Sequence, residues 1–446
     1  MISIKATAVL LEGPVALERD SLGYWNLSTL VVQGDILMMS EPIAYRTPLY
    51  PWYLAVCRVL AERHALWVIG LTQVALYVIS IWLAANIAYQ ITRLPNAKPL
   101  TAICMLPALS AIQYTSAVLS ETLFVALLLW HLSFVLKYSH HPNRKYAIWS
   151  GITFGLTILT RPIALLLFTV HIVLLLFFYT RRKRLKKANE YSMYRVSHFI
   201  LAGLVVSALL TPWITRNYLL FNKLSLTEFA GRNLWIVTFQ DGSGAGLSIP
   251  KTKNGIELHN RLSHSGNKIN TRSTWSVSNQ LVSSGLNDAQ ADQLMKQVCL
   301  DAIDSNQRSF AKKMIRRTIN FWRCAHTNLL QQGGLPSQYA PQKAWKQSSK
   351  WISDSLQYRF SQSVIGNTVL TVAISLMLFF LIFNPATRPH AIWITLIFAY
   401  FSIITGTFEI PDYRYRLVME PLLGSVFGSG ISVLLSKREL NVSLAE

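Results

Sequence analysis

Long apolar runs constrain this chain more than any other feature of its sequence. A hydrophobic content of 52% could still belong to a soluble protein with a large core, so the length of the runs decides the class. Most approach the roughly 20 residues that a helix needs to cross about 30 Å of hydrocarbon, and hardly any contains a carboxylate. The nine runs lie at about 67–90, 100–118, 122–136, 147–159, 163–179, 198–214, 364–383, 391–407 and 417–435. They predict an all-α polytopic membrane protein of about 9–10 transmembrane helices with a long extracytoplasmic loop, although the two runs beside Arg161-Pro162 could also form one kinked or re-entrant helix.

Orientation follows from the short basic loops, because lysine and arginine accumulate on the cytoplasmic side of membrane proteins. The basic run 181–187 is therefore expected inside, together with the short loops near residues 93–98, 144–145 and 388 and the carboxyl-terminal tail. The opposite face then receives residues 19–65, the corners at 120–121 and 161–162, the segment 216–360 and the corner 409–416. This pattern predicts a multi-pass protein of the inner (plasma) membrane whose site faces the periplasm or exterior.

The same reading divides the chain into three parts. Residues 1–215 form an amino-terminal transmembrane module with a first extracytoplasmic loop at 19–65, residues 216–360 form a large extracytoplasmic loop, and residues 361–446 form carboxyl-terminal transmembrane helices with a short cytoplasmic tail. The apolar run from Ile2 to Leu11 is too short to span, so a first helix is expected to be missing from this sequence.

The large loop is expected to be loosely organised, since its stretch from Ser248 to Gln290 shows no sustained period. Its end near Phe310 is expected to be helical, because lysines and arginines alternate there with apolar residues up to Arg323. Such a helix could lie on a lipid surface or present a solvated face.

A net charge of +21 would favour nucleic acid as the partner of a soluble protein, but here much of the excess lies in the short cytoplasmic loops and in the large loop, so no nucleic-acid partner is expected. The cysteines are Cys57, Cys104, Cys299 and Cys324, and no two have metal-ligand spacing. We expect neither a metal nor a cofactor.

Polar residues at helix ends on the expected outer face supply the candidate chemistry. Asp20 and Glu121 could act as a general base on an acceptor or orient it. Arginines can hold a phosphate through bidentate hydrogen bonds, and those on this face are Arg46, Arg161, Arg216, Arg414 and Arg416. Each has a simpler interpretation, as a membrane-interface anchor or a solvated carboxylate. His131 and His171 lie within apolar runs and are expected to be hydrogen-bonded inside the bundle.

A set of short motifs, in order along nearly the whole chain, resembles the GT-C superfamily of integral-membrane glycosyltransferases. The likeness is to the bacterial branch related to dolichyl-phosphate-mannose protein mannosyltransferases and to the aminoarabinose transferase of lipid A. The motifs are Asp20-Ser21 with Tyr24, the segment 45–51, Ser120-Glu121-Thr122, Thr160-Arg161-Pro162, the segment 212–218, and 413–416 leading into Pro421. The chain departs from the mannosyltransferases in having Arg19-Asp20 in place of paired acids, which puts protein acceptors and metal dependence in doubt.

The resemblance implies a GT-C-like helix bundle and transfer of one sugar, a hexosyl or pentosyl group, from a polyprenyl-phosphate donor to a lipid, glycan or protein acceptor. The reaction would be a single displacement that inverts the anomeric carbon. Asp20 and Glu121 would be the catalytic residues, and Arg46, Tyr50, Arg161, Arg216, Arg414 and Arg416 would bind substrate, with Arg216 and Arg416 at the lipid phosphate. A ligase using a polyprenyl-diphosphate glycan, a lipid or sugar carrier, and a noncatalytic scaffold are the alternatives.

Overall fold

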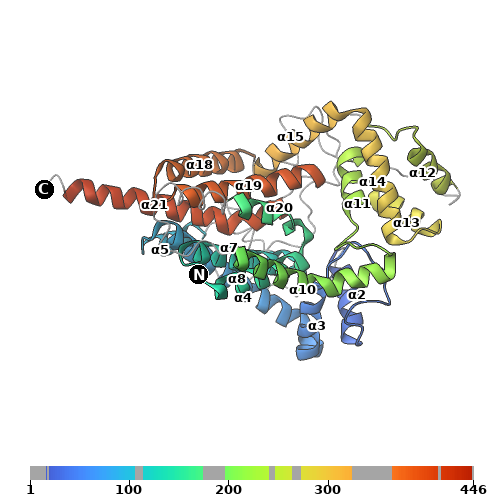
Figure 1. Ribbon diagram of the computed structural model, residues 1–446, viewed down its shortest axis with the longest axis horizontal. Helices are drawn as coiled ribbons and strands as arrows, with labels where there is room; N and C mark the ends of the chain where they lie inside the picture. The colour runs from blue at the N-terminus through green and yellow to red at the C-terminus, as the bar shows by residue number, and fades with distance from the viewer. Residues whose placement is uncertain are drawn as a thin grey trace.

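The structure, a computed structural model, describes residue 17 and residues 20–105, 114–173, 196–240, 247–263, 273–323, 364–409 and 413–443 (Figure 1). Every regular element in these ranges is a helix. Six helical stretches among them are long and apolar enough to cross a membrane: 49–92, 121–140, 197–221, 365–383, 388–408 and 414–436. The expectation of an all-α polytopic membrane protein is confirmed, whereas the total of about 9–10 spans stays a prediction.

The long helices form one bundle. In chain order they are α3 (Leu49–Ala61), α4 (Ala65–Thr92), α5 (Ala97–Cys104), α7 (Glu121–His140), α8 (Arg144–Thr160), α10 (Val196–Phe221), α18 (Val364–Phe383), α19 (Arg388–Phe408) and α21 (Glu420–Ser443). Helices α4, α7, α8 and α10 pack in sequence, and α21 packs against α4, α5 and α18. On α18, side chains such as Ile365, Leu376 and Phe379 are exposed, as lipid-facing residues of a spanning helix must be.

The structure describes part of the expected run 100–118 and part of the two runs beside Arg161-Pro162. Helix α5 ends at Cys104, and residues 106–113 of the expected run 100–118 lie outside the described residues. After α8, Arg161 has an extended backbone, with φ −148° and ψ 119°, and Pro162 opens the turn η2 (Pro162–Ala164). Proline disfavours a helical conformation in the residue before it, so the chain breaks at Arg161 and α8 does not continue into the next run.

The segment expected to be a first loop, 19–65, contains two helices. Helix α2 (Asp20–Val32) pairs with α3, and Arg58 of α3 donates to the carbonyl of Trp25 at 3.0 Å and to the Ser28 and Thr29 hydroxyls, each at 2.8 Å. The irregular part is therefore limited to residues between Val32 and Leu49. This stretch matters because it carries Arg46.

The described part of the large loop, which extends to Arg323, is not loosely organised, which corrects the expectation from its sequence. It folds into α11 (Ala230–Trp235), η3 (Ile236–Gln240), α12 (Lys253–Ser263), α13 (Thr274–Ser283), α14 (Asp288–Ser305) and α15 (Gln307–Arg323). We call α11–α14 the helical unit; it has a core of its own that includes Trp235, Leu281 and Met295. Asn287 and Gln290 form a capping box at the start of α14.

Helix α15 confirms the helix expected near Phe310, but two of its basic residues do not face lipid. Lys313 and Arg317 are buried, with Lys313 Nζ donating to the Thr238 carbonyl at 2.9 Å and Arg317 Nε to the Gly406 carbonyl at 2.6 Å. They fasten α15 to η3 and α19. Arg308 and Lys312 remain exposed on the other side of the helix.

His131 and His171 are hydrogen-bonded inside the bundle, as expected. His131 Nε2 lies 2.8 Å from His171 Nε2, and Trp393 Nε1 donates to His171 Nδ1 at 3.2 Å. His131 Nδ1 lies 3.0 Å from the Ser150 carbonyl. The chain links α7, α8 and α19 through polar atoms that would otherwise be unsatisfied in an apolar interior.

Glycines on α21 allow the closest helix contacts, and they yield a prediction. A Cβ at Gly428 would lie 2.0 Å from Thr101 Oγ1 and 2.7 Å from the Thr101 backbone nitrogen, whereas a Cβ at Gly203 of α10 meets nothing within 4 Å. Gly428→Ala should therefore lower the free energy of unfolding by about 1–3 kcal/mol through overpacking. Gly203→Ala is the matched control. Thermal unfolding in detergent checks this, and equal melting temperatures for the two variants would contradict the close packing of α5 and α21.

Candidate functional site

Glu121, the first residue of α7, is the buried centre of a charged cluster. Its side chain is 0% exposed, and its Oε1 atom forms an ion pair with Arg161 Nη1 at 2.7 Å and accepts from Arg414 Nε. Its Oε2 atom has no hydrogen-bond partner among the described residues. A buried carboxylate is tolerated only when nearby cations offset its loss of hydration. The Arg161 and Arg414 guanidinium groups must therefore stay close to Glu121, which fixes their positions.

Asp20 lies at the more exposed side of the same cluster. Its Oδ2 atom accepts from Arg414 Nη1 at 3.0 Å and its Oδ1 atom from Arg46 Nη2 at 3.3 Å, while 41% of the side chain remains exposed. Burial raises the pKa of Asp20, but Arg414 and Arg46 outweigh it and lower the pKa to about 2. Asp20 is therefore an ionised hydrogen-bond acceptor that solvent or a ligand can reach.

Arg414 connects the two carboxylates. It comes from α20 (Tyr413–Arg416), just before α21, and holds Asp20 with one nitrogen and Glu121 with another. The cluster thus joins the starts of α2 and α7, the end of α8, the irregular segment before α3 and the turn before α21. Residues far apart in the sequence meet at one end of the bundle.

One tyrosine, one serine and one threonine support this cluster. Arg46 Cζ lies 4.1 Å from the centroid of the Tyr24 ring, and Tyr24 Oη lies 3.4 Å from Ser120 Oγ. Thr47 Oγ1 donates to the Thr160 carbonyl at 3.0 Å, which ties the segment carrying Arg46 to the end of α8. Thr47 and Thr160, which are adjacent in sequence to Arg46 and Arg161, are thereby fixed to each other.

Tyr50, expected to bind substrate, is fully buried below the cluster. Its hydroxyl donates to Gln73 Oε1 at 3.1 Å, and its ring packs edge-on against Tyr24 at 4.9 Å between centroids. Tyr50 thus supports Tyr24 from within the bundle, and its contact with substrate stays a prediction.

Arg216 is also turned away from the cluster. Its side chain is 1% exposed, and its guanidinium donates to the carbonyls of Leu37, Met38, Glu41 and Ile43 and to Asn217 Oδ1, at 2.8–3.2 Å. Five N–H groups are all that a guanidinium offers, and in this structure Arg216 uses them on the protein; its contact with a donor phosphate stays a prediction.

Arg416 is buried on the opposite side of its helix turn from Arg414. Arg416 Nη1 donates to the Trp322 carbonyl at 2.9 Å, and Nη2 lies 3.9 Å from Glu420 Oε1. These contacts join α15 to the start of α21. Arg416 is therefore placed as a link between helices, not at the exposed side of the cluster where the expected phosphate contact would lie.

Glu409 is a member of this region that residue-by-residue reading missed. It caps the end of α19, and burial raises its pKa to about 7, although a hydrogen bond with Tyr415 and the charges of Arg161 and Arg414 act in the opposite direction. The signal for it was available, since Glu409 is the carboxylate that opens the corner 409–416. Within the described ranges no group of three histidine, cysteine or acidic residues could hold a metal ion.

The comparisons with known proteins agree with this architecture. The family model described as dolichyl-phosphate-mannose-protein mannosyltransferase matches residues 42–215. ArnT from Cupriavidus metallidurans, solved bound to undecaprenyl phosphate, is 14% identical, with 98% of this chain and 78% of that chain covered and a TM-score of 0.39. The archaeal oligosaccharyltransferase AglB from Archaeoglobus fulgidus, solved with an inhibitory peptide and a dolichol-phosphate, is 10% identical, with 99% and 51% covered and a TM-score of 0.50. No curated protein matches.

This chain thus spans about half of the length of AglB, with which it shares the fold. The matched residues 42–215 supply Arg46, Glu121 and Arg161, which are three of the residues in the cluster. The matched segment covers less than half of this chain and the likeness to AglB shows a shared fold; both agree with the expected resemblance to integral-membrane glycosyltransferases of the GT-C superfamily.

Proposed function

We propose that this protein transfers a sugar from a polyprenyl-phosphate donor, and that Arg46, Arg161 and Arg414 bind the donor phosphate. The observation that carries the proposal is the charge of the cluster. Within the described residues, these three guanidinium groups face the carboxylates of Asp20 and Glu121. With Glu409 protonated, one positive charge is left over at a partly exposed position, and guanidinium groups bind phosphate oxygens well.

Two comparisons support a lipid-linked donor. The matched family model is named for a transferase that uses dolichyl-phosphate-mannose, and AglB was solved with a dolichol-phosphate. We infer that the cluster faces the periplasm or exterior from the basic loops on the other side of the bundle. The acceptor would be a lipid, a glycan or a protein.

The chemistry needs one displacement. An acceptor oxygen attacks the anomeric carbon while the bond from that carbon to the phosphate oxygen breaks, and the polyprenyl phosphate leaves with the electron pair. The arginines stabilise the charge that develops on the leaving phosphate. The acceptor loses one proton, and the anomeric configuration is inverted.

Asp20 is placed to orient the acceptor and to receive that proton. In the unliganded cluster its low pKa makes it a weak base. When a donor phosphate takes hydrogen bonds from Arg46 and Arg414, those groups hold Asp20 less strongly, and its pKa rises toward its ordinary value. Donor binding therefore prepares the base.

The first prediction concerns Asp20. Asp20→Asn keeps the shape but removes the charge, and we expect transfer to fall about 100-fold or more, the range for loss of a general base. The assay offers a panel of polyprenyl-phosphate sugars with total membrane lipid and glycan acceptors in nanodiscs. Asp304→Asn is the control, since Asp304 is exposed and accepts from Gln307 Nε2 at 3.0 Å, away from the cluster.

Equal transfer by wild type and Asp20→Asn would remove Asp20 from the mechanism. The product also separates the alternatives: a single sugar supports a transferase, a preassembled glycan released from a diphosphate supports a ligase, and movement of lipid without a new bond supports a carrier. Transfer of no sugar from any monophosphate donor would overturn the proposal.

The second prediction separates binding from stability at Arg414. Arg414→Gln leaves two ion pairs, Glu121 with Arg161 and Asp20 with Arg46, so the fold keeps its buried charge paired but loses the excess positive charge. Glu121→Gln instead leaves two guanidinium groups without their buried counterion, and breaking such a pair costs about 3–5 kcal/mol. We expect Arg414→Gln to raise the donor KM more and Glu121→Gln to lower the melting temperature more. The reverse order in either measurement would contradict the proposed roles.

The third prediction concerns pH. Because the pKa of Glu409 is raised to about 7, its proton stabilises the folded state at low pH, and that contribution is lost as pH rises from about 4.5 through 7. Above pH 7 the new negative charge faces Arg161 and Arg414, so donor affinity should fall. The donor is a phosphate diester and does not titrate in this range. Glu409→Gln should bind it equally from pH 6 to 8; an unchanged pH dependence in that variant would exclude Glu409.

A further inference from the structure

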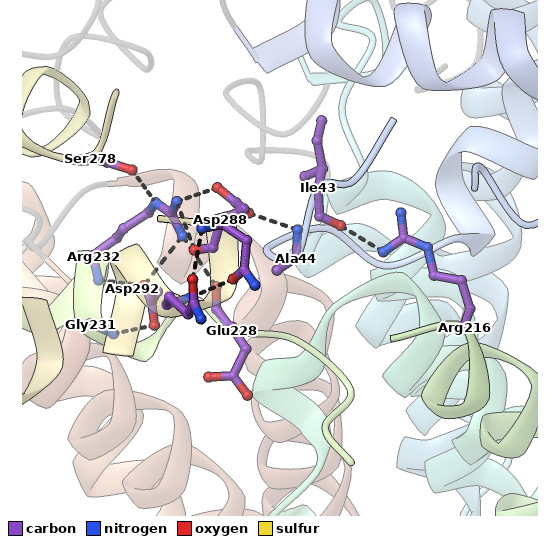
Figure 2. Close-up of polar contacts among 11 residues, drawn as sticks. Ile43, Ala44, Arg216, Glu228, Gly231, Arg232, Ser278, Asp288 and Asp292 are labelled. Carbon is purple, nitrogen blue, oxygen red and sulfur yellow. Dashed lines mark hydrogen bonds and ion pairs between the residues drawn. The ribbon is translucent and has the colours of Figure 1, made fainter. Parts of the chain in front are cut away.

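The irregular segment 37–47, which carries Arg46 to the site, is held from two sides. On the bundle side, Arg216 of α10 donates to four of its backbone carbonyls, including that of Ile43 at 2.8 Å. On the other side it contacts the helical unit. Figure 2 shows Ile43 and Ala44 lying between Arg216 and the acidic residues of that unit.

Both backbone polar groups of Ala44 are bound by the helical unit or its approach. The Ala44 N–H donates to Asp288 Oδ2 at 2.7 Å, and the Ala44 carbonyl accepts from the Glu228 N–H at 2.9 Å (Figure 2). Asp288 is the first residue of α14, so the helix places its carboxylate at a fixed position. The backbone of Ala44 is therefore set by residues more than 180 positions away in the sequence.

Arg232 holds Asp288 in place. Its guanidinium binds Asp288 Oδ1, lies 3.4 Å from Asp292 Oδ1, and donates from Nε to Ser278 Oγ at 3.0 Å. The side chain of Arg232 is almost fully buried, and Asp292 also accepts from the Gly231 and Arg232 backbone nitrogens. A charge network buried and paired in this way is rigid, because removing one partner leaves an unpaired charge.

The next two residues carry this rigidity to the cluster. The Tyr45 ring lies 5.6 Å from Phe229 and 5.2 Å from Trp275, both between ring centroids, and 5.2 Å from Arg232 Cζ. Arg46 follows directly and binds Asp20. Ala44 and Tyr45 are thus fixed by the helical unit, and Arg46 is the first residue beyond them that reaches the site.

We propose that Asp288 and Arg232 are positioning residues that set the affinity for the donor phosphate by fixing the backbone that carries Arg46. The inference rests on the proposed function of the cluster. The proposal assigns to the helical unit a role in donor binding, although none of its charged residues belongs to the cluster. Neither residue touches the cluster, so the effect passes through Ala44 and Tyr45.

Asp288→Asn tests this with a matched control on the same helix. In the wild type, one carboxylate oxygen of Asp288 accepts from the Ala44 N–H and the other from Arg232. The amide of the variant has one acceptor oxygen and one NH₂ group, so either the hydrogen bond with Ala44 or the one with Arg232 is lost. Asp301→Asn makes the same change farther along α14, where Asp301 accepts from Thr252 and Asn254 inside the helical unit. Asn287 and Gln290 retain the helix cap in both variants.

Two measurements on the full-length protein in nanodiscs are needed. Hydrogen exchange of peptides covering residues 42–47 reports the Ala44 contact independently of activity. Binding of undecaprenyl phosphate, with inorganic phosphate as a competitor, reports the site. We expect Asp288→Asn to exchange faster and to bind the lipid about tenfold more weakly, the effect of losing about one charged hydrogen bond. Where the wild type transfers sugar, the donor KM should rise while kcat changes less than about threefold.

Faster exchange with unchanged lipid affinity would overturn the proposal, because the backbone would then move without consequence at the site. Equal effects of Asp288→Asn and Asp301→Asn would also overturn it, since they would indicate general loosening of the helical unit. Failure of the proposed function gives a different result: the wild type transfers no sugar and binds undecaprenyl phosphate no better than Arg414→Gln.

Discussion

The burial of Glu121 is the interaction on which the rest of the site depends. An ion moved into a low-dielectric interior loses several kcal/mol of effective hydration, and only well-placed opposite charges offset that loss. Arg161 and Arg414 supply them from distant parts of the chain. Because Glu121 fixes Arg414 through Nε, Arg414 Nη1 is presented to Asp20 in one geometry. A single buried carboxylate thereby determines where the exposed one lies.

The sequence alone identified the members of this cluster but not their division of roles. Asp20, Arg46, Glu121, Arg161 and Arg414 could be grouped because each lies at a helix end on the same face of the bundle. Arg216 and Arg416 have the same position and the same chemistry, yet they bind backbone carbonyls. Which carbonyls lack a partner depends on how residues 37–43 and the end of α15 fold in three dimensions. No local pattern reports this.

The spanning helices could be predicted from the sequence, whereas the helical unit could not, and the difference lies in helix length and composition. A helix such as α18 is predominantly apolar, since lipid and protein interior both favour apolar residues, and its composition is visible in any window. Helices α12 and α13 are only 11 and 10 residues long and bury narrow stripes. Their stability comes from caps and from packing around Trp235, so sequence periodicity is too short to detect them.

The buried arginines also explain how an irregular segment can have one conformation beside the site. Residues 37–43 form no regular helix, so their carbonyls need donors from elsewhere when water is excluded. A guanidinium offers five N–H groups in a fixed plane, and Arg216 uses them on one short stretch of backbone. Apolar packing could bury the same stretch but could not select one arrangement of its carbonyls. Arg216 of the bundle therefore binds residues 37–43 from one side, and Arg232 of the helical unit acts on Ala44 from the other side through Asp288. The position of Arg46 depends on both.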